Sequence, residues 1–163
     1  MQTLSVTPPR SSLANLVQTA LQTLTPLRAL LDKLQPVALL LARLYVAQVF
    51  FFSGLTKIRD WGTTVALFTD EYQVPLLSPS FAAGMAIVGE LGLPVLLAFG
   101  LGGRFATAGL FVMNIVAVIS FTDISPAGVQ QHYLWGVILA ALVLWGPGKL
   151  SVDHVWLRRL GLN

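Results

Sequence analysis

The sequence of 163 residues contains no cysteine. Disulfide bonds, thiolate metal sites, iron–sulfur clusters, c-type haem attachment and thiol relays are therefore excluded within this chain. The motifs that bind phosphate groups, dinucleotides or catalytic zinc are also missing, as is the nucleophile elbow of hydrolases. Because no complete catalytic constellation is present, the sequence does not predict a stand-alone enzyme, although a subunit of a membrane oxidoreductase stays possible.

Charged residues are scarce as well. They make up 10% of the chain, whereas hydrophobic residues make up 55% and the mean hydropathy is +0.75. A soluble domain carries about a quarter charged residues, so this chain has too few to cover a water-facing surface. The formal net charge of +3 does not indicate nucleic-acid binding, because the basic residues form no cluster with interleaved aromatic residues. The composition predicts a protein that contacts the lipid bilayer.

Several apolar segments have the length of membrane-spanning helices. Each has about 18–21 residues, close to the ~20 needed to cross ~30 Å of hydrocarbon. The segments are residues 37–56, 81–101, 105–122 and 126–145. The sequence therefore predicts an all-α membrane protein, a bundle of four transmembrane helices with an N-terminal amphipathic helical arm. Three regions are expected, namely the arm, the transmembrane domain and a cytoplasmic tail, with bounds 1–35, 36–153 and 154–163.

The N-terminal arm has two parts. Residues 1–10 are polar and proline-rich, which predicts disorder. Residues 12–34 carry leucines at spacings of three and four, which predicts an amphipathic helix that Pro26 breaks or kinks. This helix is expected either to lie on the membrane surface or to pack against a partner chain in the cytosol.

Lysine and arginine residues are distributed unequally between the two ends of the predicted bundle. The end with both termini carries most of them, namely Arg10, Arg28, Lys33, Arg104, Lys149, Arg158 and Arg159. The other end has Lys57 and Arg59 beside the acidic residues Asp60, Asp70, Glu71 and Asp123. Because loops rich in lysine and arginine stay on the cytoplasmic side, both termini are predicted to be cytoplasmic.

Arg43 and Glu90 are charged residues inside predicted spans, where a lone charge is costly and usually pairs or lines a cavity. At ~1.5 Å per residue, Arg43 lies roughly 10 Å beyond Pro36, and Glu90 lies roughly 15 Å from Gly100. The first two spans are antiparallel neighbours, so we expect an Arg43–Glu90 ion pair with Asn114 at a similar depth. This polar core either fixes the helix register or belongs to a substrate or proton pathway.

Polar residues also gather at the outer end of the bundle. Lys57 is expected either to extend its ammonium group to the interface or to continue a polar seam from Arg43. Lys57, together with Gln131 and His132 near the start of the fourth span, is a possible ligand-binding residue. His132 could bond a quinone carbonyl or bind a metal with a carboxylate, with a structural role as the main alternative. A single histidine lacks the matched donors of a metal site, so no metal is predicted.

Three stretches of the sequence, taken in order, resemble the DoxX family of small bacterial membrane proteins. They are residues 43–57, with Arg43, Gly54 and Lys57; residues 89–104, with Glu90, Gly100 and Arg104; and residues 146–153, which read Gly-Pro-Gly-Lys-Leu-Ser-Val-Asp. The resemblance covers residues 36–153 and leaves the N-terminal arm outside. Asn114 and Pro94 have no counterpart in the family pattern.

The resemblance implies a four-helix protein of the bacterial inner membrane that is associated with membrane redox systems, including quinone-linked thiosulfate oxidation and oxidative-stress complexes. It favours an accessory or anchoring subunit, with quinone as a candidate cofactor and a redox protein or further copies of the chain as candidate partners. Without cysteine, the chain cannot carry the thiol chemistry of some related membrane proteins. The alternatives are a small transporter or permease component and a structural membrane scaffold.

Overall fold

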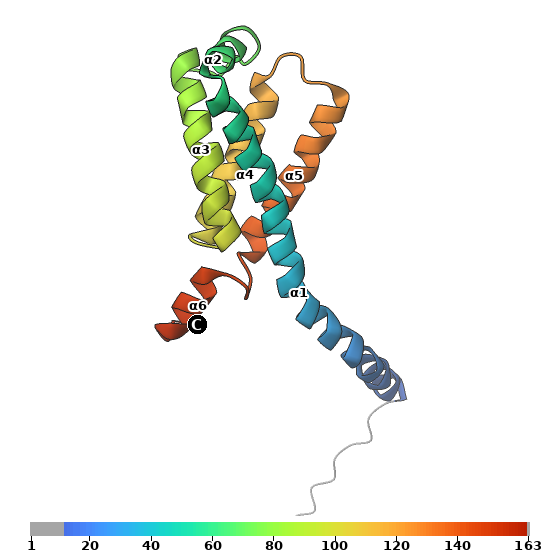
Figure 1. The fold of residues 1–163 in the computed structure, drawn as a ribbon. Coiled ribbons are helices and arrows are strands. Elements are labelled where there is room, and N and C mark those ends of the chain that lie inside the picture. The colour runs from blue at the N-terminus through green and yellow to red at the C-terminus, as the bar shows by residue number, and fades with distance from the viewer. Residues whose placement is uncertain (1–11, 163) are drawn as a thin grey trace, which may run out of the picture. The chain divides into compact units, whose positions relative to one another are not determined.

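The computed structural model describes residues 12–162, which fold into helices with no extended strand (Figure 1). The helices are α1 (Ser12–Arg59), α2 (Trp61–Asp70), α3 (Pro79–Phe99), α4 (Gly103–Ser120), α5 (Pro126–Trp145) and α6 (Val152–Arg159). The predicted disorder of residues 1–10 falls outside the described residues. The described chain forms two compact units, one ending at Gln35 and the other beginning at Pro36.

Four of these helices are long and apolar enough to cross a membrane: α1, from Val17 onward, and α3, α4 and α5. Their outward faces carry large apolar side chains, and Val88, Phe105 and Val137 are 70%, 76% and 69% exposed. Such faces are stable against lipid tails because the helix satisfies its own backbone hydrogen bonds. The prediction of an all-α protein with four membrane-spanning helices is confirmed.

The first membrane-crossing helix begins much earlier than the sequence predicts. Residues 12–35 and the segment that follows belong to one continuous helix, so the helix does not break at Pro26, and the expected helix start at Pro36 is wrong. A proline removes one backbone donor and clashes with the preceding turn, yet its fixed φ is compatible with a helix. Apolar helix formers on both sides therefore keep the helix intact through each proline.

The unit from Pro36 to the end of the described chain has one main apolar core. In Figure 1, α3, α4, α5 and this part of α1 run alongside one another. The core residues come from all four helices and are Val46, Ala47, Phe50, Leu97, Ala106, Leu110, Leu139 and Leu142. A smaller cluster joins Phe68 of α2 to Ala82 and Ala83 of α3. The small residues of α3 let α2 lie close against it at the end of the bundle away from α6.

Local hydrogen bonds fix the ends of the shorter helices. The loop expected after the first span contains α2, which begins because the Asp60 carboxylate accepts a bond from the Thr63 backbone N–H, at 2.9 Å. The pKa of Asp60 is held below its usual range by the bonds from Thr63. In the same way, Ser151 caps α6, so a helix occupies most of the region expected to be a tail.

Candidate functional site

A largely buried ion pair joins α1 and α3. The Lys57 ammonium lies 2.8 Å from Glu90 Oε2 and 3.0 Å from Oε1, and it also donates to the Ser53 hydroxyl at 2.8 Å. The two charged side chains are only 14% and 12% exposed. The helices approach closely here because Gly54 faces the side chains of Glu90 and Leu91, and a Cβ atom at Gly54 would lie 2.9 Å from Leu91.

This ion pair lies near the middle of α3. Glu90 precedes the Gly100 turn by ten residues, or roughly 15 Å at ~1.5 Å per residue. The predicted Arg43–Glu90 pair is wrong, and so is the expectation that Lys57 extends to the interface. Helical side chains lean toward the N-terminus of their helix, so Lys57 points back into the bundle, toward Glu90.

Arg43 has a different set of partners at the opposite end of the bundle. Its side chain is 1% exposed, and its guanidinium donates to the backbone carbonyls of Pro147, at 2.7 Å, and Leu150, at 2.5 Å. Nearby, the Asp153 carboxylate accepts bonds from the backbone N–H groups of Gly102 and Gly103, at 3.1 and 2.9 Å. Together these bonds hold the segment between α5 and α6 against α1 and the α3–α4 turn, which is a structural role.

Asn114 pairs with His132 rather than with the charged residues. Its amide nitrogen donates to the His132 carbonyl at 2.9 Å, and its side-chain oxygen lies 2.8 Å from His132 Nδ1. Because the amide nitrogen must face the carbonyl, the amide oxygen faces Nδ1, which therefore carries the proton. The imidazole packs edge-on against Trp135. Asn114 thus links α4 to α5, while the neighbouring Gln131 side chain is exposed.

A groove of about 500 Å³ lies between α3 and α4. Its walls are apolar, with Met85, Leu93, Val112, Met113 and Val116 among the lining residues. The groove opens between exposed apolar side chains, since Met85 and Val112 are 55% and 58% exposed. In a membrane this opening faces the lipid tails.

Four polar side chains line the same groove: Lys57, Tyr72, Glu90 and Ser120. The Ser120 hydroxyl is buried and has no hydrogen-bond partner within residues 12–162. The Tyr72 hydroxyl also has no bonded partner in that part of the chain, and its ring is stacked between Phe68 and Phe121, with centroid distances of 5.0 and 4.8 Å. Buried polar groups without partners are rare, so the Ser120 hydroxyl is suited to a bound ligand.

The Tyr72 phenol is held in its neutral, hydrogen-bond-donating form. Burial raises its pKa, and the negative charges of Glu90 and Glu71 raise it further. Sequence reasoning missed both Tyr72 and Ser120. Tyr72 lies in the segment between α2 and α3, and nothing in the sequence distinguishes Ser120 from other serines near helix ends.

The fold and groove define a multi-pass membrane protein with a lateral, partly polar cavity. The sequence matches the DoxX family over residues 38–123, a range that contains Arg43, Lys57, Glu90 and Asn114. A relative in Haemophilus influenzae, described only as an uncharacterized protein, is 32% identical over 126 residues, which cover 72% of this chain and 82% of that protein. No solved structure matches the chain. The chain belongs to the DoxX family, as predicted.

Proposed function

We propose that this protein is an accessory subunit of a membrane redox system and that it binds a quinone in the groove between α3 and α4. The observation that carries the proposal is the buried Ser120 hydroxyl, which has no partner among the described residues, in a cavity whose walls are mostly apolar. The family resemblance supplies the connection to redox systems. The apolar walls and the hydroxyl groups of the groove support a quinone as the ligand.

The chemistry of the groove matches a molecule with an apolar body and hydrogen-bond acceptors at one end. Tyr72 and Ser120 present two hydroxyls that can donate hydrogen bonds, whereas the three N–H groups of the Lys57 ammonium are directed to Glu90 and Ser53. A quinone ring carries two carbonyl acceptors, and its isoprenoid tail is apolar. The Glu90 carboxylate is already paired with Lys57, so the groove offers little to a cationic head group.

The residues of this chain would bind and position the ligand. Tyr72 and Ser120 would orient the ring through its carbonyl oxygens, and the apolar walls would exclude water from it. A bound quinone supplies two-electron, two-proton chemistry, and a separate redox protein would exchange electrons with it. This division suits a subunit that binds quinone for a partner rather than a complete enzyme.

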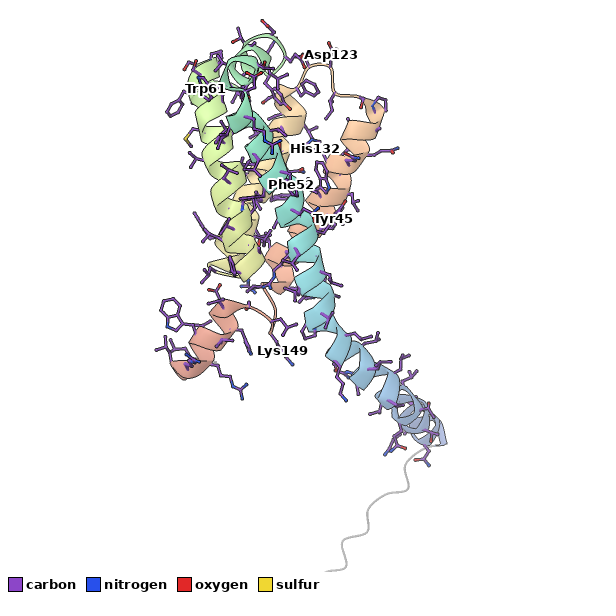
Figure 2. All side chains as sticks on the ribbon, viewed as in Figure 1. Tyr45, Phe52, Trp61, Asp123, His132 and Lys149 are labelled. Carbon is purple, nitrogen blue, oxygen red and sulfur yellow. The ribbon has the colours of Figure 1, made fainter. Side chains whose placement is uncertain are left out.

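The orientation of the chain forms part of the proposal. We infer a bacterial inner-membrane protein with the α6 end in the cytoplasm, where Arg104, Lys149 and Arg158 are exposed. Lys149 lies at this end in Figure 2, and Trp61 and Asp123 lie at the other. The arm up to residue 35 and the tail after residue 153 would then lie on the cytoplasmic side, and the polar end of the groove would lie in the outer half of the bilayer.

A transporter is less well supported than a quinone-binding subunit. The apolar side chains of Phe50, Leu97, Leu110 and Leu139 meet in the centre of the bundle. The groove opens sideways, toward lipid. A flux assay in proteoliposomes separates the two functions, because a transporter would move substrate and would lose that activity in Glu90→Gln.

A pair of glycine substitutions tests quinone binding directly. A Cβ atom at Gly92, which lines the groove, would meet nothing within 4 Å, and the same is true of Gly84, which lies outside it on the same helix. Gly92→Phe should therefore fill the groove without a clash, and Gly84→Phe is the matched control. Short-chain ubiquinone and menaquinone analogues should bind the wild type and Gly84→Phe, and Gly92→Phe should bind much more weakly. Equal binding by all three proteins would contradict the proposed site.

A second experiment tests the accessory role. Membranes from cells that lack this chain should show altered quinone-linked respiration or altered tolerance to oxidative stress, and the wild-type gene should restore both. Gly92→Phe should fail to restore them, although Gly84→Phe should succeed. No change in either property on loss of the chain would count against the redox assignment even if quinone binds.

A further inference from the structure

Gln48 is a polar residue on the outward face of α1. Its side chain is exposed, and within residues 12–162 its amide has no hydrogen-bond partner. It lies five residues beyond Arg43, roughly 7 Å further along the helix at ~1.5 Å per residue, and beside Pro94, Val95 and Ala98 of α3. The amide is therefore inside the part of the bundle that faces lipid.

Four other polar side chains inside the spans are hydrogen-bonded within the bundle, unlike Gln48. Arg43, Lys57, Asn114 and His132 all have hydrogen-bond partners within the bundle. An amide exposed to hydrocarbon has no water to bond, and such groups commonly bond across to a neighbouring transmembrane helix. Gln48 therefore points to a partner helix that the single chain does not supply.

The chemistry of the amide favours a second copy of this chain as that partner. A carboxamide carries both a donor nitrogen and an acceptor oxygen, so two identical amides can satisfy each other. Two copies inserted with the same orientation are related by a two-fold axis along the membrane normal. That axis brings the same residue of each copy to the same depth, as an isologous interface requires.

The surface around Gln48 is also self-complementary in shape. Leu41, Tyr45 and Phe52 share the face of α1 with Gln48, because their spacings of three, four and seven residues correspond to whole helical turns, and they are 61%, 46% and 57% exposed. Figure 2 labels Tyr45 and Phe52 on this helix. Next to this face lies a cavity of about 390 Å³ between α1 and α3. One surface thus provides both projecting aromatic side chains and a hollow to receive them.

We propose that the protein forms a two-fold symmetric dimer in the membrane through this face of α1 and α3, with the Gln48 amides of the two copies hydrogen-bonded to each other. The groove between α3 and α4 uses other side chains, so this interface is independent of the proposed quinone site.

Cysteine crosslinking tests the interface cleanly, because the chain contains no cysteine. Leu44→Cys places a thiol one turn from Gln48, on a residue that is 44% exposed and lines the α1–α3 cavity. Val137→Cys, on α5 and 69% exposed, is the control. Oxidation in native membranes should give a disulfide-linked dimer of Leu44→Cys, and Val137→Cys should give several-fold less.

The role of the amide is tested in the Leu44→Cys background. Gln48→Leu should lower the dimer yield at least about tenfold, because two reciprocal hydrogen bonds are lost, and Gln48→Asn should keep part of it. The mass of the wild type in mild detergent should be twice the 17.6 kDa of one chain. Crosslinking no greater than in Val137→Cys, a product with a different protein only, or a dimer unaffected by Gln48→Leu would overturn the proposal.

Discussion

Removal of one partner of the Lys57–Glu90 pair should destabilise the protein far more than removal of both. With the Lys57 ammonium 2.8 Å from Glu90 Oε2, Coulomb's law gives an attraction of about 6 kcal/mol at an effective dielectric constant of ~20. Most of this attraction offsets the cost of removing both charges from water. A single substitution leaves the other charge buried and unpaired, which costs about 3–5 kcal/mol.

Methionine is the suitable replacement at both positions, because it is unbranched and adapts to irregular space. We expect Lys57→Met and Glu90→Met each to lower the free energy of unfolding by about 3–5 kcal/mol. The double variant should lie within roughly 2 kcal/mol of the wild type, because paired replacement of a buried ion pair is often nearly neutral. Arg59→Met removes an exposed charge from the end of the same helix and should change little.

The assay is reversible unfolding in mixed micelles, followed by circular dichroism, for the four members of a double-mutant cycle. The coupling energy between the two positions should reach several kcal/mol, well above the ~0.5 kcal/mol seen for independent sites. If the double variant loses as much stability as the sum of the two single variants, the charges are not coupled and the reasoning fails.

The remaining predictions concern three other groups. Arg43→Lys cannot reach both the Pro147 and Leu150 carbonyls, so it should cost about 1.5–3 kcal/mol and speed proteolysis of residues 146–151. Asn114→Leu removes two hydrogen bonds to His132 and should cost about 1–3 kcal/mol, measured by thermal unfolding in detergent. Tyr72 should ionise above its ordinary value of 10.0, which ultraviolet difference titration against Tyr72→Phe would detect. Because this pKa is raised in the folded state, the stability that Tyr72 contributes is complete below pH 10.0 and is lost as the pH rises through the raised value.

The positions of most spans could be predicted from sequence, because hydrophobic length is a local property. α5 was predicted as residues 126–145 and is Pro126–Trp145. The start of α1 could not be predicted from prolines alone. The penalty for a proline inside a helix is a few kcal/mol, and favourable residues on both sides can offset it.

The pairing of charges could not be derived from depth alone. Arg43 and Glu90 are close in estimated depth, but depth takes no account of side-chain direction or of carbonyl groups exposed at a helix end. Lys57 leans back along α1 and reaches Glu90, whereas Arg43 finds the carbonyls of Pro147 and Leu150. The importance of Ser120 depends on the packing of α3 against α4, which is a property of the tertiary structure.

The most direct test of the proposed function is mass spectrometry of the wild type, Gly92→Phe and Gly84→Phe, each purified from native membranes in mild detergent. The wild type and Gly84→Phe should retain a quinone and a redox partner protein. Gly92→Phe should retain the partner and lose the quinone, since only the groove is filled. A wild type that carries neither quinone nor partner, or a Gly92→Phe variant that keeps the quinone at the wild-type level, would contradict the account.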